Sequence, residues 1–286
     1  MTFSRRRALL TAFSALATGR APAASLEAQG GQYASFDGAQ MFYRRMGQGP
    51  PVILMHGFLS DGPRTWFNTG IAQSLAQAGF SVVAPDARAH GLSAAPPGPY
   101  PKDVMAMDVE ALVRTLRLRS YRLFGYAMGA RTAVRLMARG ARPARCVLGG
   151  AGILGTTDVE RVARPNLESI RTGRNARDPR LGVLVQSAIR LQKLSPAALI
   201  AVLQAQVSTP RADLQSIRTP ALVLTGDKDE VEGSPAELAT LLGAGAVTRP
   251  PGDHVSALRE PRFGQLATAF LKSHDPPARF VAAAAL

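Results

Sequence analysis

Residues 123–130 read LFGYAMGA, a short apolar run followed by a turn that has a glycine on each side. Gly125 and Gly129 lack a Cβ atom, so they allow a strand and a helix to approach closely around a tight turn. We therefore predict a strand over residues 121–125, a turn centred on Ala127 and a helix over residues 128–139. Taken alone, this pattern is more often simple strand–helix packing than a functional site.

The chain around this turn alternates short apolar strands with helical segments, after an initial hairpin whose turn is Asp37-Gly38. The predicted strands cover residues 32–36, 40–46, 51–55, 81–85, 146–150, 220–226 and 246–249. The other predicted helices cover residues 71–78, 104–116, 235–242 and 261–273. Uniformly apolar strands that alternate with helices indicate an α/β protein, with a mostly parallel central sheet and helices on both faces.

The strand pattern stops between residues 155 and 210, where the chain is Arg-rich and helix-prone. We interpret residues 155–210 as a helical cap inserted into one α/β core, formed by residues 30–154 and 211–274. With 286 residues and 46% hydrophobic content, the chain is long enough to bury one large core. The last residues, 275–286, are predicted to be a loose tail.

The N-terminal residues 1–25 have the layout of an export signal. Three arginines at positions 5–7 precede an apolar stretch over residues 8–17 and then a segment of small residues. Consecutive arginines before a short apolar stretch favour the twin-arginine route, so we expect an exported bacterial protein, periplasmic or secreted. The apolar stretch is too short for a stable membrane anchor. The alternative is a frayed basic tail.

The formal net charge of +14 can indicate a nucleic-acid partner or an anionic membrane surface. The arginines are scattered, however, and no run interleaves basic with aromatic residues. We therefore interpret the charge as a solvated basic surface and expect no nucleic-acid partner. Cys146 is the only cysteine, so no disulfide can form within one chain, and its apolar strand suggests a small buried residue.

Polar motifs follow the predicted strands at their carboxyl ends. They are HGF at 56–58, DARAHGLS at 86–93, GYAMG at 125–129, TGDKD at 225–229 and GDHVSAL at 252–258. Open parallel sheets place their sites at this edge. We therefore expect these motifs to converge although they are far apart along the chain.

In their order, the motifs resemble those of the α/β-hydrolase family, and the resemblance covers roughly residues 32–273. That family has a nucleophilic serine in a G-x-S-x-G turn, then an acid, then a histidine. The corresponding residues here are Ala127, Asp229 and His254. The resemblance implies a hydrolase of ester or other acyl bonds, in which His254 is the general base and Asp229 orients it. Asp227 is a competing candidate for the acid.

The same resemblance implies an oxyanion hole made by the backbone N–H groups of Met128 and Phe58. It also implies that His56 and His90 brace their loops instead of reacting. Ala89 stands where the family usually has a glycine.

Aromatic residues near these motifs are candidates for an apolar substrate pocket. They are Trp66, Phe67 and Tyr126, together with Phe58. Core packing is an equally good explanation for such residues.

Ala127 has a methyl group where acyl transfer needs an oxygen, so the chain is expected to be strongly impaired as a serine hydrolase. Three hypotheses stay open: a hydrolase whose serine has been replaced, a ligand-binding protein that has lost catalysis, and an enzyme that uses His254 and Asp229 as a base without a covalent step. The expected partner is a small, largely apolar acyl compound. No metal cluster, phosphate loop or dinucleotide motif is found, so no cofactor or metal is expected.

Overall fold

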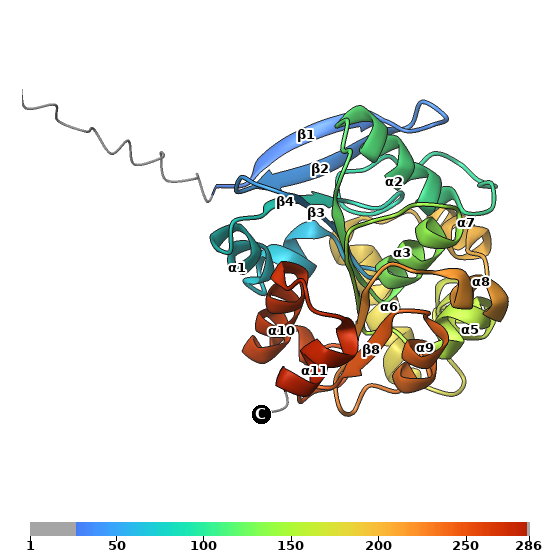
Figure 1. Ribbon diagram of the computed structural model, residues 1–286. Coiled ribbons are helices and arrows are strands. Elements are labelled where there is room, and N and C mark those ends of the chain that lie inside the picture. The colour runs from blue at the N-terminus through green and yellow to red at the C-terminus, as the bar shows by residue number, and fades with distance from the viewer. Residues whose placement is uncertain (1–26, 285–286) are drawn as a thin grey trace, which may run out of the picture.

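The computed structural model describes residues 27–284, so the predicted export signal at residues 1–25 lies outside the described residues. Eight strands form one sheet in the order β1-β2-β4-β3-β5-β6-β7-β8 (Figure 1). The strands are β1 (Gln29–Ala34), β2 (Gln40–Met46), β3 (Pro51–Met55), β4 (Ser81–Pro85), β5 (Arg122–Tyr126), β6 (Cys146–Gly149), β7 (Ala221–Leu224) and β8 (Gly245–Thr248). β1 and β2 pair antiparallel with their neighbours and all other pairs are parallel, which confirms the predicted mostly parallel sheet.

The central strands are buried on both faces because their side chains alternate between two hydrophobic cores. In β3, Ile53 and Met55 enter one core, whereas Val52 and Leu54 enter the other. Successive side chains of a strand point to opposite faces of the sheet, so a strand with helices on both sides must be apolar throughout.

Helices cover each face of the sheet and meet one of these two cores. The first core includes residues of α2 (Val104–Thr115), α3 (Met128–Ala138), α8 (Arg211–Ser216) and α9 (Pro235–Leu241). The second includes residues of α1 (Ile71–Gln77), α10 (Pro261–Lys272), α11 (Pro277–Ala284) and the short π-helix η1 (Pro63–Phe67).

The C-terminal segment differs from its prediction. Residues 275–286 were expected to be a loose tail, but α11 occupies Pro277–Ala284. Its Phe280 ring meets the Phe270 ring edge-on with 5.2 Å between centroids. The prediction is wrong because the segment begins with polar residues and prolines (HDPP) but continues as a short amphipathic helix, which packs on α10 and β8.

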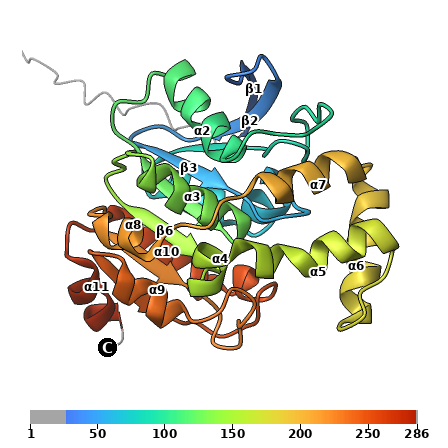
Figure 2. The same ribbon diagram turned by 90° about the vertical axis from the view of Figure 1, so that its right-hand side faces the viewer.

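Between β6 and β7 the chain forms α4 (Ile153–Thr157), α5 (Val159–Thr172), α6 (Pro179–Gln192) and α7 (Pro196–Ala205) before α8. Figure 2 shows α5, α6 and α7 projecting away from the sheet. These three helices bury a third cluster of apolar side chains, which also contains Ala89, Val104, Met105 and Met128 of the core. The projecting helices therefore pack over the carboxyl-end loops of the sheet.

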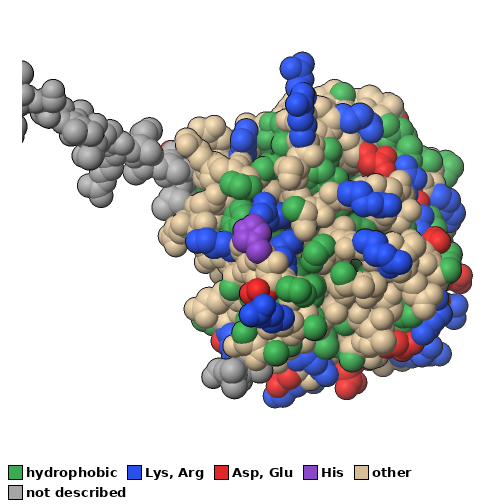
Figure 3. Space-filling view, in the orientation of Figure 1, with side chains coloured by type: hydrophobic (Ala, Val, Ile, Leu, Met, Phe, Trp, Pro, Cys, Tyr) green, Lys and Arg blue, Asp and Glu red, His purple; other side chains and the backbone are tan. Residues whose placement is uncertain are grey.

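On the face drawn in Figure 3, basic side chains lie scattered among apolar and acidic ones instead of forming one continuous patch. None of the helices within residues 27–284 has the length and apolarity that crossing a bilayer would require.

Candidate active site

The turn around Ala127 has an unusual backbone conformation that the flanking glycines make possible. Ala127 has φ 49° and ψ −111°, which is outside the regions that alanine favours and costs about 1–3 kcal/mol. A Cβ atom on Gly125 would lie 2.2 Å from the Gly129 oxygen, and one on Gly129 would lie 2.0 Å from the Met55 oxygen. Only glycine fits at either position, and the turn therefore presents residue 127 at the sharp junction of β5 and α3.

Hydrogen bonds on both sides hold this turn in place. The Ala127 N–H donates to the Gly149 oxygen at 2.8 Å, and the Arg131 N–H donates to the Ala127 oxygen at 3.0 Å as α3 begins. The methyl group of Ala127 is almost buried, with 7% exposure. The strained conformation is thus retained without an oxygen at the tip.

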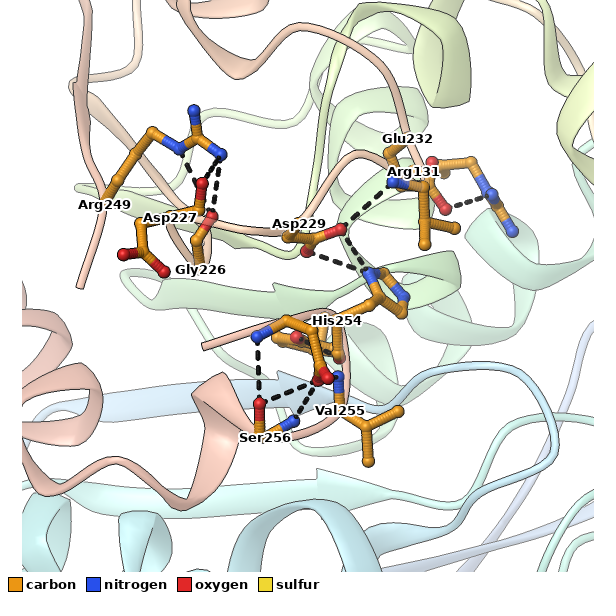
Figure 4. A network of polar contacts seen from close by, with 12 residues as sticks. Arg131, Gly226, Asp227, Asp229, Glu232, Arg249, His254, Val255 and Ser256 are labelled. Carbon is orange, nitrogen blue, oxygen red and sulfur yellow. Dashed lines mark hydrogen bonds and ion pairs between the residues drawn. The ribbon is translucent and has the colours of Figure 1, made fainter. Parts of the chain in front are cut away.

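His254 and Asp229 are two ionisable side chains that lie in contact with each other (Figure 4). Nδ1 of His254 lies 3.0 Å and 2.9 Å from the two carboxylate oxygens of Asp229. A carboxylate can only accept, so in the neutral imidazole Nδ1 carries the proton and Nε2 has the lone pair. The Asp229 side chain is 2% exposed and that of His254 is 23% exposed, so the acid is shielded while the imidazole can still be reached.

The side chain of Asp227, the competing candidate for the acid, does not contact His254. Its Oδ1 accepts from the Gly252 N–H at 2.9 Å, and the Arg249 side chain donates to its backbone oxygen at 2.6 Å. Figure 4 shows Asp227 beside Arg249, separated from the imidazole by Asp229. The geometry therefore pairs His254 with Asp229.

The loop that carries His254 is fixed by its neighbours. The Tyr126 hydroxyl donates to the His254 backbone oxygen at 2.6 Å, and the two rings lie 5.5 Å apart. Asp253 Oδ1 accepts from the N–H groups of Val255 and Ser256 at 2.9 Å and 2.8 Å. These hydrogen bonds, those to Ser256 above all, lower the pKa of Asp253 to about 2. The imidazole is thus held by contacts to its backbone as well as to Asp229.

The two N–H groups expected to form an oxyanion hole lie at the ends of different elements. Met128 is the first residue of α3, where a backbone N–H has no acceptor within its own helix. Phe58 follows β3, is half-buried and lies edge-on to His90 with 5.5 Å between ring centroids. Both residues join the same apolar cluster beneath the projecting helices.

His56 and His90 brace the loops on either side of Phe58. His56 Nε2 accepts from the Ala87 N–H at 2.9 Å, and His90 Nε2 accepts from the Leu59 N–H at 3.2 Å. Burial lowers the pKa of both imidazoles, that of His90 to about 3, so both are neutral near pH 7. Ala89 has φ 64°, which explains why a glycine would suit this position.

The predicted pocket residues do not share one environment. Trp66 is fully buried and packs on Phe124 with 4.8 Å between ring centroids, so its prediction as a pocket residue is wrong. Phe67 is half-buried against the same core. Tyr126 is 3% exposed and supports the His254 loop as described above. Large aromatic side chains were drawn into the core because it offers them the most apolar contact.

Sequence reasoning missed an ion pair directly behind the site. Arg131 of α3 donates from Nη1 to Glu232 Oε1 at 2.7 Å, three residues beyond Asp229 (Figure 4). Both side chains are nearly buried. The signal in the sequence is that Arg131 lies in the first turn of α3 among small and apolar residues.

No group of three or more His, Cys, Asp or Glu side chains within residues 27–284 is arranged to hold a metal ion. Cys146 is buried in β6, and burial raises the pKa of its thiol. The ionisable groups that the structure brings together at the candidate site are the His254 imidazole and the Asp229 carboxylate.

Known proteins resemble this chain in sequence. A family model described as the alpha/beta hydrolase fold matches residues 50–165. The chain is 34% identical over 99 residues to the AB hydrolase superfamily protein YisY of Bacillus subtilis, a match that covers 35% of this chain and 36% of that protein. It thus spans about a third of the length of the curated relatives it matches.

Solved structures match over most of the chain. An esterase from Exiguobacterium antarcticum has a TM-score of 0.71 and 20% identity, covering 86% of this chain and 100% of that one. The enol-lactonase from Burkholderia xenovorans LB400 has a TM-score of 0.70 and 22% identity, covering 85% of this chain and 100% of that one. At these identities the likeness shows the fold.

Proposed function

This chain has the α/β-hydrolase fold, and on that premise we propose that its site is built to act on an ester or other acyl bond of a small, largely apolar compound. The observation that carries the proposal is the His254–Asp229 pair at 2.9 Å, in a loop that is hydrogen-bonded to Tyr126, the residue before the strained turn of Ala127. In this proposal, His254 Nε2 is the general base and Asp229 holds the imidazole in the tautomer that leaves Nε2 free.

The backbone N–H groups of Met128 and Phe58 would stabilise the oxyanion that develops on the acyl carbonyl. A helix N-terminus adds a favourable field for that negative charge, because its first N–H groups lack intrahelical acceptors. The proposed site thus has a base, an orienting acid and oxyanion donors, and it lacks the attacking atom.

Ala127 closes the covalent route, because a methyl group cannot form a bond to an acyl carbon. Loss of the nucleophile in a serine hydrolase lowers turnover by about six powers of ten. The oxyanion donors and substrate binding still leave roughly a thousandfold acceleration over water. We therefore expect this sequence to bind its acyl compound and to hydrolyse it very slowly.

A second candidate is direct hydrolysis, in which His254 takes a proton from a water molecule that attacks the acyl carbon. The observation in its favour is that the imidazole is oriented by Asp229 and remains partly exposed, so a water molecule can reach it. The proton passes from water to Nε2 as the C–O bond forms, and then from Nε2 to the leaving group.

The deciding experiment is hydrolysis of p-nitrophenyl butyrate by the unchanged chain and by Ala127→Ser. The serine should raise kcat/KM by about a thousandfold or more, since it restores the attacking oxygen in a preformed turn. The matched control is Ala127→Ser combined with His254→Ala, which should lose that gain. No gain from Ala127→Ser in a folded protein would overturn the proposal.

Direct hydrolysis, the second candidate, is tested by the ester hydrolysis rate of the unchanged chain. The unchanged chain should then hydrolyse the ester measurably above buffer, and His254→Ala should abolish that rate. Turnover that is insensitive to His254→Ala would exclude direct hydrolysis by this base. Saturable binding without turnover in either form would instead indicate a ligand-binding protein.

A further inference from the structure

The outer face of α6 carries apolar side chains that nothing in the described part of the chain covers. Val183, Leu184 and Leu191 are 67%, 57% and 83% exposed. Leu184 and Leu191 are seven residues apart and Val183 adjoins Leu184, so the three lie along one side of the helix. Exposed apolar side chains gathered on one helix face mark a binding surface more often than isolated ones do.

These side chains form one wall of a groove of about 900 Å³ between α6 and the core. The opposite wall includes Arg64 of η1 and Arg259 of the short 3₁₀ helix η2 (Ala257–Arg259). Ligand pockets commonly have volumes of about 300–1,000 Å³ and combine apolar walls with a few polar groups. The groove is open to solvent, and it shares with such pockets the combination of an apolar wall and a few charged groups.

The charge of the groove is positive. Arg180 and Arg259 are exposed, and no carboxylate within residues 27–284 forms an ion pair with either one. Asp178 precedes α6, but its carboxylate accepts from the backbone N–H groups of Arg180 and Leu181. Arg64 is already paired with Asp61. Two guanidinium groups are thus available for an anion.

The groove borders the candidate active site at two points. Gln192, at the end of α6, donates from Nε2 to the Leu59 oxygen at 2.8 Å, directly after Phe58. Arg259 ends the turn that follows the His254 loop. A ligand in the groove therefore lies against the segments that carry a proposed oxyanion donor and the proposed base.

We propose that this groove binds the apolar chain of a small anionic amphiphile, with Arg180 and Arg259 binding its carboxylate. A second copy of this chain is a poorer occupant, because each copy carries a formal net charge of +14. This inference rests on the proposed function in that it assigns an apolar acyl compound with a carboxylate as the substrate class of the same site.

The test is calorimetric titration of the unchanged chain with sodium dodecanoate below its micelle concentration, with 1-dodecanol as the neutral partner. We expect saturable binding of one dodecanoate, at least about tenfold tighter than dodecanol, and weakening as salt is added. Arg259→Gln and Leu184→Asn should each weaken dodecanoate binding by about tenfold. The matched controls are Arg119→Gln and Leu92→Asn, exposed residues outside the groove, which should leave binding unchanged.

Several results would overturn the inference: no saturable binding, equal affinity for dodecanol, or equal effects of the groove and control variants. Self-association that Leu184→Asn abolishes would show that a second copy covers the face. If Leu184→Asn fails to fold, dodecanoate binding by Leu191→Asn and Arg259→Gln tests the inference instead. Both side chains are exposed, so these substitutions should leave the fold intact. This test measures binding and does not depend on turnover. If Ala127→Ser gains no ester hydrolysis but the chain still binds dodecanoate, only the proposed function is overturned.

Discussion

Glu232 accepts a hydrogen bond from Arg131 at 2.7 Å and so joins the helix that follows the Ala127 turn to the loop that carries Asp229. The pair is tightly enclosed, since a Cβ atom on Gly155 would lie 1.4 Å from Glu232 Oε2. The Glu232 backbone oxygen also accepts from the Gly155 N–H at 3.1 Å. One residue thus contacts α3, the acid loop and the start of α4.

Glu232→Ala should lower the free energy of unfolding by about 3–5 kcal/mol, because it leaves the Arg131 guanidinium buried without a counter-charge. Chemical denaturation measures this effect. The matched control is Glu237→Ala, which removes an exposed ion pair with Arg211 and should cost less than about 1 kcal/mol. Equal costs for the two variants would show that the buried pair contributes no more than a surface pair.

Asp229→Asn and Asp227→Asn distinguish the two acids in the Ala127→Ser background. Asp229→Asn should lower kcat by about four powers of ten, since the amide no longer holds His254 in the required tautomer. Asp227→Asn should have a small effect, because the Asp227 carboxylate accepts from the Gly252 N–H and lies away from the imidazole. Ester hydrolysis under single-turnover conditions measures both. A larger loss with Asp227→Asn would contradict the pairing seen in the structure.

Stability should fall as the pH is lowered from 7.5 to 5.5. Burial lowers the pKa of His90 to about 3 in the folded chain, whereas the unfolded imidazole has an ordinary pKa of about 6.5. The unfolded state therefore binds more protons below about pH 6.5, and the contribution of His90 to stability decreases by about 1.4 kcal/mol between pH 7.5 and pH 5.5. The contribution of His90 is fully present above pH 6.5 and is lost as the pH falls towards 3.

The control for this pH dependence is His90→Gln, which offers an acceptor and a donor without a titrating group. Denaturation at both pH values should show a dependence that is smaller by about 1.4 kcal/mol in the variant. His56 should contribute with the same sign, since burial lowers its pKa too. An unchanged pH dependence in His90→Gln would mean that His90 is not held neutral by burial.

Phe280→Ala tests whether α11 belongs to the folded core. The substitution removes a ring that packs on Phe270 and should cost about 1–2 kcal/mol, less than a fully buried aromatic because Phe280 is half-buried. Arg279→Ala, an exposed change on the same helix, should stay within about 0.5 kcal/mol. Thermal unfolding measures both, and equal effects would show that α11 is not docked through Phe280.

The predicted strands and helices agree closely with the structure wherever the pattern is local. The segment at residues 51–55 is a strand in both, because five consecutive apolar residues between a Gly-Pro break and a polar loop suit a buried strand. Gly125 and Gly129 marked the turn at Ala127, since close backbone approach needs residues without a Cβ atom. The predicted α/β-hydrolase fold is confirmed by the family match and by the solved structures.

Other features could not be predicted, because they depend on which distant segments meet. The sequence does not say that Trp66 packs on Phe124 in the core or that Phe280 packs on Phe270. Both contacts join segments that the sheet order and the helix layers bring together. An aromatic residue has the same sequence signal in a core and in a pocket.

By itself, the sequence determined the order of strands and helices, the glycine-flanked turn and the missing oxygen at residue 127, because these follow from local periodicity, backbone freedom and residue chemistry. Tertiary structure alone decided that Glu232 meets Arg131 and that α6 leaves an apolar face beside two arginines. It also shows that the carboxylate beside His254 is that of Asp229, which the resemblance had favoured over Asp227. The reason is physical: side-chain contacts between residues far apart in the chain are set by strand order and helix packing, and both emerge only when the whole core is buried.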